Sequence, residues 1–234
     1  MAAVDSPTAV HIGWTLLGVV AAVIFYGRFY VQWIASELHK RSVMPIAFWY
    51  MSGVGSLMLL VYAVVTQSPL GALGQNMNIV IYSRNLVHIW RKKGRLSQRV
   101  DIALHVAVVA IALTALGFVA WTWYREYQHT EAATADVARV VWIWLAIGVA
   151  GQALFALRFL GQWIVTEIRR ESVVPAVFWH LSLVAATLQC AAFVQREEWI
   201  FAAGMAATIL IYARNIWFVH SRGADDAESL EQAS

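Results

Sequence analysis

The sequence has 234 residues, of which 60% are hydrophobic and only 13% are charged, and its mean hydropathy is +0.61. A soluble domain carries about 25% charged residues and fewer than about half apolar ones, so this composition excludes a soluble globular protein. The single cysteine, Cys190, excludes an internal disulfide, a cysteine-based zinc site and an iron–sulfur cluster.

Apolar runs that are long enough to cross a membrane recur along the chain. Roughly 20 apolar residues cross about 30 Å of hydrocarbon. Pro45, Pro69 and Pro175 stand where three of these runs begin, and there the missing N–H costs little. We therefore expect an all-α integral membrane protein with seven transmembrane helices, at residues 11–34, 44–66, 69–90, 101–124, 139–166, 175–194 and 199–220.

The basic residues between these helices predict the orientation of the chain. Ten of them fall on one side: Lys40, Arg41, Arg91, Lys92, Lys93, Arg95, Arg99, Arg169, Arg170 and Arg222. Only Arg125, Arg139 and Arg196 fall on the other side. By the positive-inside rule, the N-terminus is outside, the C-terminus is cytoplasmic, and residues 91–99 are the strongest orienting signal.

The sequence contains an internal repeat. Residues 28–90 align without gaps on residues 158–220, and 21 of the 63 aligned positions are identical. Each repeat holds three predicted helices, and the helix at 101–124 lies between them. Three crossings plus one return the chain to its starting side, so the two repeats have the same orientation and a pseudo-twofold axis along the membrane normal.

The repeated motifs resemble a known family of membrane domains. They read RFYVQWIASELHKRSVMPIAFWYMS followed by NIVIYSRN in the first half, and RFLGQWIVTEIRRESVVPAVFWHLS followed by TILIYARN in the second. This pattern is similar to the N-terminal membrane domain of some lipid-A-disaccharide synthases, which is in turn similar to SWEET and PQ-loop transporters. The resemblance implies two parallel triple-helix bundles joined by a linker helix (3+1+3) in the bacterial inner membrane.

The repeat and the resemblance together divide the chain into four segments. We expect the first bundle at 1–95, the linker helix at 96–130, the second bundle at 131–222 and a disordered cytoplasmic tail at 223–234. The tail is acidic and polar without an apolar period, which is typical of disorder.

Four arginines lie within or at the predicted spans, together with polar residues that the repeat duplicates. Residues three or four apart share a face of a helix, so each half has one polar face on its first helix and one on its third. The candidate substrate-binding or phosphate-binding residues are Arg28, Gln32, Tyr82, Arg84, Asn85, Arg158, Gln162, Tyr212, Arg214 and Asn215. The halves differ most on the third helix, where Gln75, Asn76 and Asn78 are matched by Met205, Ala206 and Thr208.

Two interpretations of the four arginines stay open. In the first they have structural roles: each snorkels to the nearby interface, or pairs with Glu37 or Glu167. In the second they meet around the central axis and bind a phosphate, because a guanidinium binds phosphate bidentately and stays charged. His180, which replaces Tyr50 of the first repeat, and His105 are candidate proton carriers, although a packing role is more typical of a single histidine.

The expected function follows from these features. No metal-ligand spacing, phosphate loop or paired acidic residues within the spans are evident, and no glycosyltransferase domain follows residue 220, so we expect no enzymatic activity, catalytic residue, cofactor or metal. We expect a transporter or flippase for an anionic glycolipid or polyprenyl-phosphate-linked sugar connected with lipid A or lipopolysaccharide modification. The alternatives are a SWEET-like transporter of a small neutral solute and an accessory subunit that anchors a lipid A glycosyltransferase. The expected partners are thus a membrane lipid or lipid-linked sugar and a membrane-associated glycosyltransferase, not nucleic acid, and the sequence does not indicate the oligomeric state.

Overall fold

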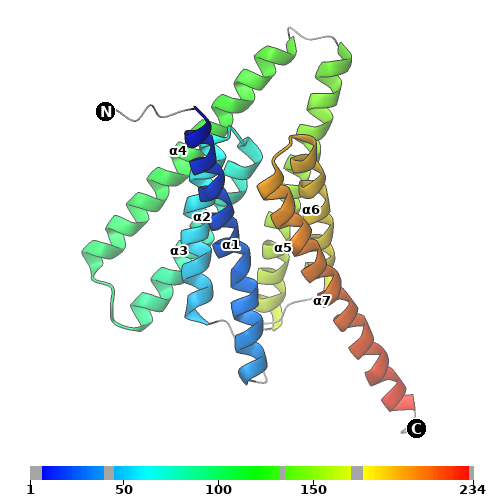
Figure 1. Ribbon diagram of the computed structural model, residues 1–234. Helices are drawn as coiled ribbons and strands as arrows, with labels where there is room; N and C mark the ends of the chain where they lie inside the picture. Colours follow the sequence, from blue (N-terminus) through cyan, green and yellow to red (C-terminus); the bar gives the residue numbers. More distant parts are fainter. Residues whose placement is uncertain (1–6, 40–44, 132–134, 170–175, 232–234) are drawn as a thin grey trace. The chain divides into compact units, whose positions relative to one another are not determined.

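The computed structural model describes residues 7–39, 45–131, 135–169 and 176–231, and within these ranges the chain is helical except at the turns between helices. The chain forms two compact units: unit 1 is residues 1–134 and unit 2 is residues 135–234. Figure 1 shows the helices of each unit, which are α1 (Pro7–His39), α2 (Ile46–Val65), α3 (Pro69–Lys92) and α4 (Gln98–Glu131) in unit 1, and α5 (Ala135–Arg169), α6 (Ala176–Gln195) and α7 (Trp199–Glu231) in unit 2.

Each of the seven predicted helices is present, and this confirms the all-helical class. In the described part of the chain, six helices are long and apolar enough to cross a membrane, and α3 is not among them. At about 1.5 Å per residue, the 24 residues of α3 are long enough to do so. Its lower apolar content comes from polar and charged residues, of which Gln75 and Asn76 are buried inside unit 1 and Arg84, His88, Arg91 and Lys92 are exposed.

The helices make equivalent contacts in the two units. In unit 1, α2 packs against both α1 and α3, and in unit 2, α6 packs against both α5 and α7. The remaining helix, α4, packs against α3 (Figure 1). Unit 1 therefore contains both the expected first bundle and the helix expected to link the bundles.

Proline and serine define where the helices of unit 1 begin. Pro45 precedes the first residue of α2 in an extended conformation, and Pro69 is the first residue of α3. Ser68 caps α3, since its side-chain oxygen accepts a hydrogen bond from the Gly71 amide at 3.0 Å. These positions confirm the predicted role of Pro45 and Pro69, whereas Pro175 lies outside the described residues.

The repeat extends to the turns, where the two sequences no longer match. Gln67 (φ 55°) joins α2 to α3 and Glu197 (φ 59°) joins α6 to α7, both in the left-handed region, and the repeat aligns these two positions with each other. In each turn the following amide donates to a carbonyl near the end of the preceding helix: Ser68 to Ala63 at 2.8 Å, and Glu198 to Phe193 at 2.9 Å. The shared geometry therefore depends on the backbone hydrogen bonds and not on side-chain identity.

Small residues allow the first two helices of each unit to approach closely. A Cβ atom on Gly55 of α2 would lie 2.8 Å from the Phe25 Cβ and 2.9 Å from its backbone in α1. In unit 2 the glycine is on the other helix: a Cβ on Gly151 of α5 would lie 3.1 Å from the Ala185 carbonyl of α6. The repeat pairs Gly55 with Ala185, and Gly151 with Ala21, and all four are buried. Small residues at such crossings are how membrane helices gain van der Waals contact.

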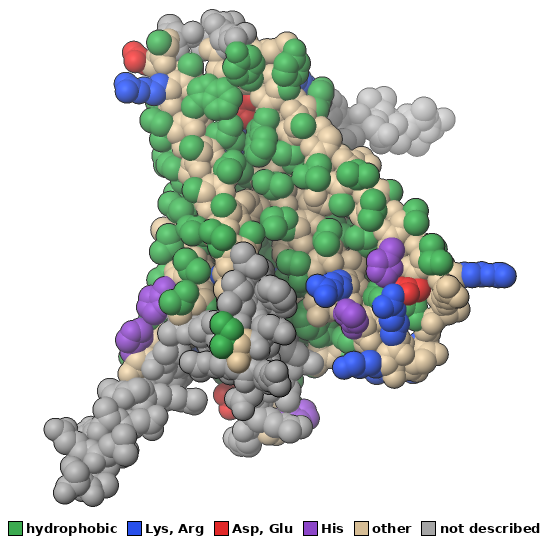
Figure 2. Space-filling model, turned by 180° about the vertical axis from the view of Figure 1, so that it is seen from behind, with side chains coloured by type: hydrophobic (Ala, Val, Ile, Leu, Met, Phe, Trp, Pro, Cys, Tyr) green, Lys and Arg blue, Asp and Glu red, His purple; other side chains and the backbone are tan. Residues whose placement is uncertain are grey.

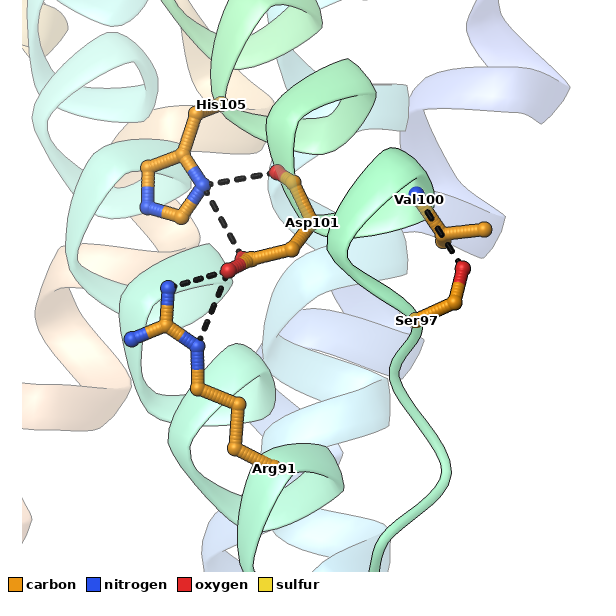
Figure 3. A network of polar contacts seen from close by, with 5 residues as sticks. All are labelled: Arg91, Ser97, Val100, Asp101 and His105. Carbon is orange, nitrogen blue, oxygen red and sulfur yellow. Dashed lines mark hydrogen bonds and ion pairs between the residues drawn. The ribbon is translucent and has the colours of Figure 1, made fainter.

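The turn between α3 and α4 is held by a polar network (Figure 3). The Arg91 Nε donates to the Asp101 carboxylate at 3.0 Å, and the His105 Nδ1 lies 3.2 Å from its other oxygen. Ser97 precedes α4, and its hydroxyl accepts a hydrogen bond from the Val100 amide at 3.4 Å. His105 is exposed, and its polar contact with Asp101 does not test whether it carries protons. Asp101 also lies in the first turn of α4, where a negative charge is favourable.

Apolar side chains cover much of the face that Figure 2 shows. On α4 these exposed residues are Val100, Ile102, Val106, Val109, Leu113, Leu116, Trp121, Tyr124 and Tyr127. Soluble proteins rarely expose an apolar surface of this extent to water, whereas a surface in contact with lipid is apolar. The basic residues between α3 and α4 are exposed beside it: Arg91, Lys92, Lys93, Arg95 and Arg99. This pattern is typical of a membrane protein.

The last helix is longer than predicted. The sequence predicts that the final span ends at residue 220 and that a disordered tail begins at 223, whereas α7 is helical to Glu231. Helix propensity explains the difference, because residues 224–231 contain alanine, glutamate and leucine, which favour a helix, and no proline.

Candidate functional site

Arg28 lies inside unit 1, surrounded by aromatic rings. Its side chain is only 5% exposed, and the guanidinium lies 3.6 Å from the ring centre of Phe25. The Nη2 donates a hydrogen bond to the Tyr82 hydroxyl of α3 at 3.3 Å, and the Nη1 donates to the Phe25 carbonyl. We call this group the arginine cage of unit 1: Arg28, Phe25, Phe29, Phe48 and Tyr82.

Unit 2 contains an equivalent group at the positions related by the repeat. The Arg158 Nη1 donates to the Tyr212 hydroxyl at 3.0 Å and to the Ser182 hydroxyl at 2.9 Å. The arginine cage of unit 2 is Arg158, Phe155, Phe178, Ser182 and Tyr212. In each unit the cage joins the three helices of the repeat, since the arginine comes from the first, the phenylalanine at 48 or 178 from the second, and the tyrosine from the third.

The direction of these side chains bears on the two interpretations of the arginines. Arg28 is nearer the C-terminal end of α1, so snorkelling would require it to extend toward that end. Its guanidinium instead contacts Phe25, three residues toward the N-terminal end, and Arg158 contacts Phe155 in the same way. The structure therefore explains Arg28 by cation–π contacts and hydrogen bonds inside unit 1, and not by snorkelling. A desolvated cation–π contact stabilises by about 2 kcal/mol.

Arg84 and Arg214 are placed differently. Successive residues of an α-helix are rotated by about 100°, so Arg84, two positions after Tyr82, projects from the opposite side of α3. Both Arg84 and its repeat equivalent Arg214 are exposed, whereas Tyr82 and Tyr212 are buried. The structure thus brings Arg28 together with Tyr82, and Arg158 with Tyr212, but places the other two arginines outside the cages.

The asparagines and glutamines of the predicted site lie on the first and third helices of each repeat. Asn85 and Asn215 are half-buried, and each donates a hydrogen bond to its own helix, to the Ile81 and Ile211 carbonyls respectively, at 2.8 Å. Gln32 is half-buried on α1. The side chain of Gln162 lies outside the described residues. Because Asn85 and Asn215 each retain a carbonyl oxygen as a hydrogen-bond acceptor, they suit a ligand hydroxyl beside Arg84 and Arg214.

Over residues 75–78, α3 is more polar than the repeat-equivalent residues 205–208 of α7, and the structure explains part of this difference. The Asn76 Nδ2 donates a hydrogen bond to the Ala112 carbonyl of α4 at 3.3 Å. Its repeat equivalent, Ala206, is exposed on α7. Asn76 therefore contributes to the packing of α4 on α3, and α4 has no counterpart in the repeat.

Sequence reasoning missed the phenylalanines of the cages. Phe25 and Phe155 supply the ring nearest each guanidinium, yet they precede the aligned segments, which begin at Arg28 and Arg158. Their spacing is a usable signal, because each phenylalanine stands three residues before the arginine, and helical side chains lean toward the N-terminus. Ser182 is identical in the repeat to Ser52, but sequence reasoning assigns neither of them a role.

The buried arginines of the cages and the exposed arginines on α3 and α7 can make different interactions. The cage arginines already use their guanidinium groups in contacts within their own unit. Arg84 and Arg214 are exposed on α3 and α7, where a phosphate-bearing ligand or a lipid headgroup can reach them. Among the described residues, no group of three or more histidine, cysteine, aspartate or glutamate side chains is placed to hold a metal ion.

Comparison with known proteins gives a consistent result. The family model described as the Lipid A Biosynthesis N-terminal domain matches the chain twice, at residues 17–87 and 147–217. The two matches are in the same register as the two aligned segments of the sequence, which confirms the internal repeat. No solved structure matches the chain.

The chain is also similar to curated proteins named lipid-A-disaccharide synthase. It is 30% identical over 187 residues to the protein from Chlamydia abortus, which covers 78% of this chain and 29% of that protein. It is 30% identical over 178 residues to the protein from Chlamydia trachomatis serovar D, covering 74% and 28% respectively. The chain therefore spans less than a third of the length of these relatives. Because the family model covers more than half of its residues, in two copies, the chain belongs to the Lipid A Biosynthesis N-terminal domain family.

Proposed function

We propose that this protein binds and translocates a phosphate-bearing glycolipid or polyprenyl-phosphate-linked sugar used in lipid A or lipopolysaccharide modification. The observation that carries the proposal is the exposure of Arg84 and Arg214, two arginines at equivalent positions of the repeat, on α3 and α7. The family connects the protein to lipid A biosynthesis. The proposal assigns no catalytic step to this chain.

The ligand chemistry follows from the properties of arginine. A guanidinium keeps its charge at physiological pH and offers a planar fork that matches two phosphate oxygens. Asn85 and Asn215, adjacent in sequence to the two arginines, add hydrogen-bonding groups suited to sugar hydroxyls. A guanidinium also donates hydrogen bonds to neutral hydroxyls, but an anion gains charge attraction in addition, so these residues favour an anionic substrate.

We further propose that the two repeats form parallel triple-helix bundles linked by α4, with α3 as a seventh span. The two family matches in one chain and the equivalent helix contacts in the two units support this arrangement. Parallel repeats require an odd number of crossings between them, and α4 supplies it. The N-terminus is then outside the cell, and the exposed basic residues between α3 and α4 face the cytoplasm of an inner-membrane protein.

Cysteine labelling tests this orientation. Thr66, in the turn after α2, and Gln98, at the beginning of α4, are both exposed. In a chain whose Cys190 is replaced by alanine, we expect Thr66→Cys to react with an impermeant thiol reagent in intact cells. Gln98→Cys should react only after the cells are opened. Labelling of Gln98→Cys in intact cells contradicts the proposed orientation.

Conservative substitution of the exposed arginines tests the ligand site. Lysine retains the charge but loses one charge-assisted hydrogen bond, worth about 1.5–3 kcal/mol, so Arg84→Lys and Arg214→Lys should each weaken binding of a phosphate-bearing lipid by roughly tenfold to a hundredfold. Binding is measured on purified protein in detergent, with the dephosphorylated lipid as the ligand control.

Arg139→Lys is the matched control, because Arg139 is exposed on α5 and lies outside the repeated motifs. It should bind as the parent does. If both Arg84→Lys and Arg214→Lys also bind as the parent does, the two arginines have no role in phosphate recognition and the proposed ligand class loses its support.

A second candidate is favoured by the relatives. The proteins named lipid-A-disaccharide synthase contain a segment like this chain within a much longer polypeptide. An accessory role, in which this domain places a glycosyltransferase at the membrane, would explain that arrangement. In that case, purified protein would retain a glycosyltransferase through affinity purification and would not move lipid by itself.

A further inference from the structure

Two histidines of unit 2 lie against each other at positions where unit 1 has a different pair. His180 of α6 and His220 of α7 have ring centres 5.6 Å apart, with an interplanar angle of 77°. Their repeat equivalents in unit 1 are Tyr50 and Trp90, whose ring centres are 6.1 Å apart. The Trp90 Nε1 donates a hydrogen bond to the Tyr50 hydroxyl at 2.7 Å. The fold therefore brings the side chains at these two positions into contact in both units.

The pair in unit 1 has an evident structural role, and the pair in unit 2 has different chemistry. Tyrosine and tryptophan join two helices through a hydrogen bond and ring contact, and both are typical of a membrane interface. Imidazoles bury less apolar surface, and two protonated rings at this distance would repel each other. The histidine pair, unlike the tyrosine–tryptophan pair, presents ring nitrogens that can bind a metal ion.

From this pair, we propose that His180 and His220 form a binding site for a divalent transition-metal ion. Zn²⁺ binds imidazole nitrogen at about 2.0–2.1 Å, so the centre of each ligating ring lies about 3.2 Å from the ion. Two rings on one tetrahedral ion then have centres roughly 5 Å apart. The observed distance of 5.6 Å between the two ring centres is close to this value.

The hydrogen bond of His220 prepares it to act as a ligand. Its Nδ1 lies 2.9 Å from the Ile216 carbonyl, one turn earlier in α7. A carbonyl can only accept, so Nδ1 carries the proton and the lone pair is on Nε2. Histidines that bind metals commonly donate their other ring nitrogen to a carbonyl in this way, which fixes both tautomer and orientation.

The exposure of both histidines and the nature of the ligands define the class of ion. Both side chains are exposed, so an ion can reach them from water. Imidazole suits Zn²⁺, Ni²⁺ and Cu²⁺, whereas Mg²⁺ and Ca²⁺ prefer oxygen ligands. Two protein ligands leave the other coordination positions to water or to an external ligand, so the site is weaker than a four-ligand structural zinc site.

The repeat supplies a matched variant for the test. In H180Y/H220W, unit 2 carries the pair that unit 1 already accommodates, so the fold should be retained while both ligands are lost. Binding of Ni²⁺ or Zn²⁺ is titrated on the purified full chain without a histidine tag. We expect one ion per chain in the parent protein. The metal affinity should fall by at least about tenfold in the variant. Loss of a residue that only hydrogen-bonds to a metal ligand already lowers metal affinity by about that much, and the variant loses the ligands themselves.

His105→Gln is the control, since His105 is exposed on α4 and contacts Asp101. It should retain the parent affinity. A measurement on the unmodified chain complements the variants: X-ray absorption of bound Zn²⁺ should show two imidazole ligands. The absence of binding in the parent, equal affinity in H180Y/H220W, or a zinc environment made of oxygen alone overturns the proposal.

Discussion

Replacing Arg28 by lysine is expected to lower the free energy of unfolding by about 2–4 kcal/mol. Lysine keeps the buried charge, but its ammonium cannot lie over the Phe25 ring and donate a hydrogen bond to Tyr82 at the same time. The desolvated cation–π contact contributes about 2 kcal/mol, and a buried hydroxyl left without its partner costs about 1–3 kcal/mol. The measurement is reversible unfolding of the purified protein in detergent, followed by near-ultraviolet circular dichroism.

Arg84→Lys is the matched control for this substitution. Arg84 is exposed on α3, and exposed substitutions usually change stability by less than about 0.5 kcal/mol. The two variants thus separate structural from ligand-binding arginines: Arg28→Lys should lose stability, and Arg84→Lys should lose ligand affinity. Equal stability of Arg28→Lys and the parent contradicts the structural role of the arginine cage of unit 1.

Gly55→Ala is expected to destabilise unit 1 by about 1–3 kcal/mol, because it overpacks the crossing of α1 and α2. The new Cβ would lie 2.8 Å from the Phe25 Cβ and 2.9 Å from Phe25 backbone atoms, and the backbone of α1 cannot move aside as the end of a flexible side chain can. The two helices must then separate, with loss of the packing between them. The loss is measured as a lower midpoint of unfolding in detergent.

Gly53, two residues earlier in α2, provides a control of opposite sign. A Cβ at this position would lie 3.5 Å from a Leu86 methyl carbon, an ordinary van der Waals distance. Gly53→Ala should therefore gain about 0.5–1 kcal/mol from helix propensity. Destabilisation by Gly53→Ala equal to that by Gly55→Ala would mean that close approach at Gly55 is not the cause.

Much of the fold could be predicted because it depends on local patterns. Apolar runs located the helices, and Pro45 and Pro69 marked where α2 and α3 begin. The internal repeat was visible in the identities between the two halves, and the family model matches both copies. The association of α4 with unit 1 could not be predicted, because an unrepeated helix has no counterpart from which its contacts can be inferred.

The candidate site was predicted in composition but not in arrangement. The sequence shows which polar residues recur, and a helical wheel separates Tyr82 from Arg84. It does not show that Arg28 turns toward Phe25, because that choice depends on rings supplied by three helices. The histidine pair was also hidden, since His180 and His220 are far apart in sequence and match no metal-binding spacing.

The most direct test of the proposed function is lipid translocation in vesicles that contain only this protein. The purified chain is reconstituted into liposomes with a fluorescent polyprenyl-phosphate-linked sugar, and an impermeant reductant reports the fraction exposed on the outer leaflet. We predict that the protein moves the fluorescent lipid of the inner leaflet, which the reductant cannot reach, to the outer leaflet. The R84K/R214K variant should do so at least about tenfold more slowly. Protein-containing liposomes that keep the inner pool protected as well as empty liposomes do, or that move only free neutral sugar, would contradict the proposal.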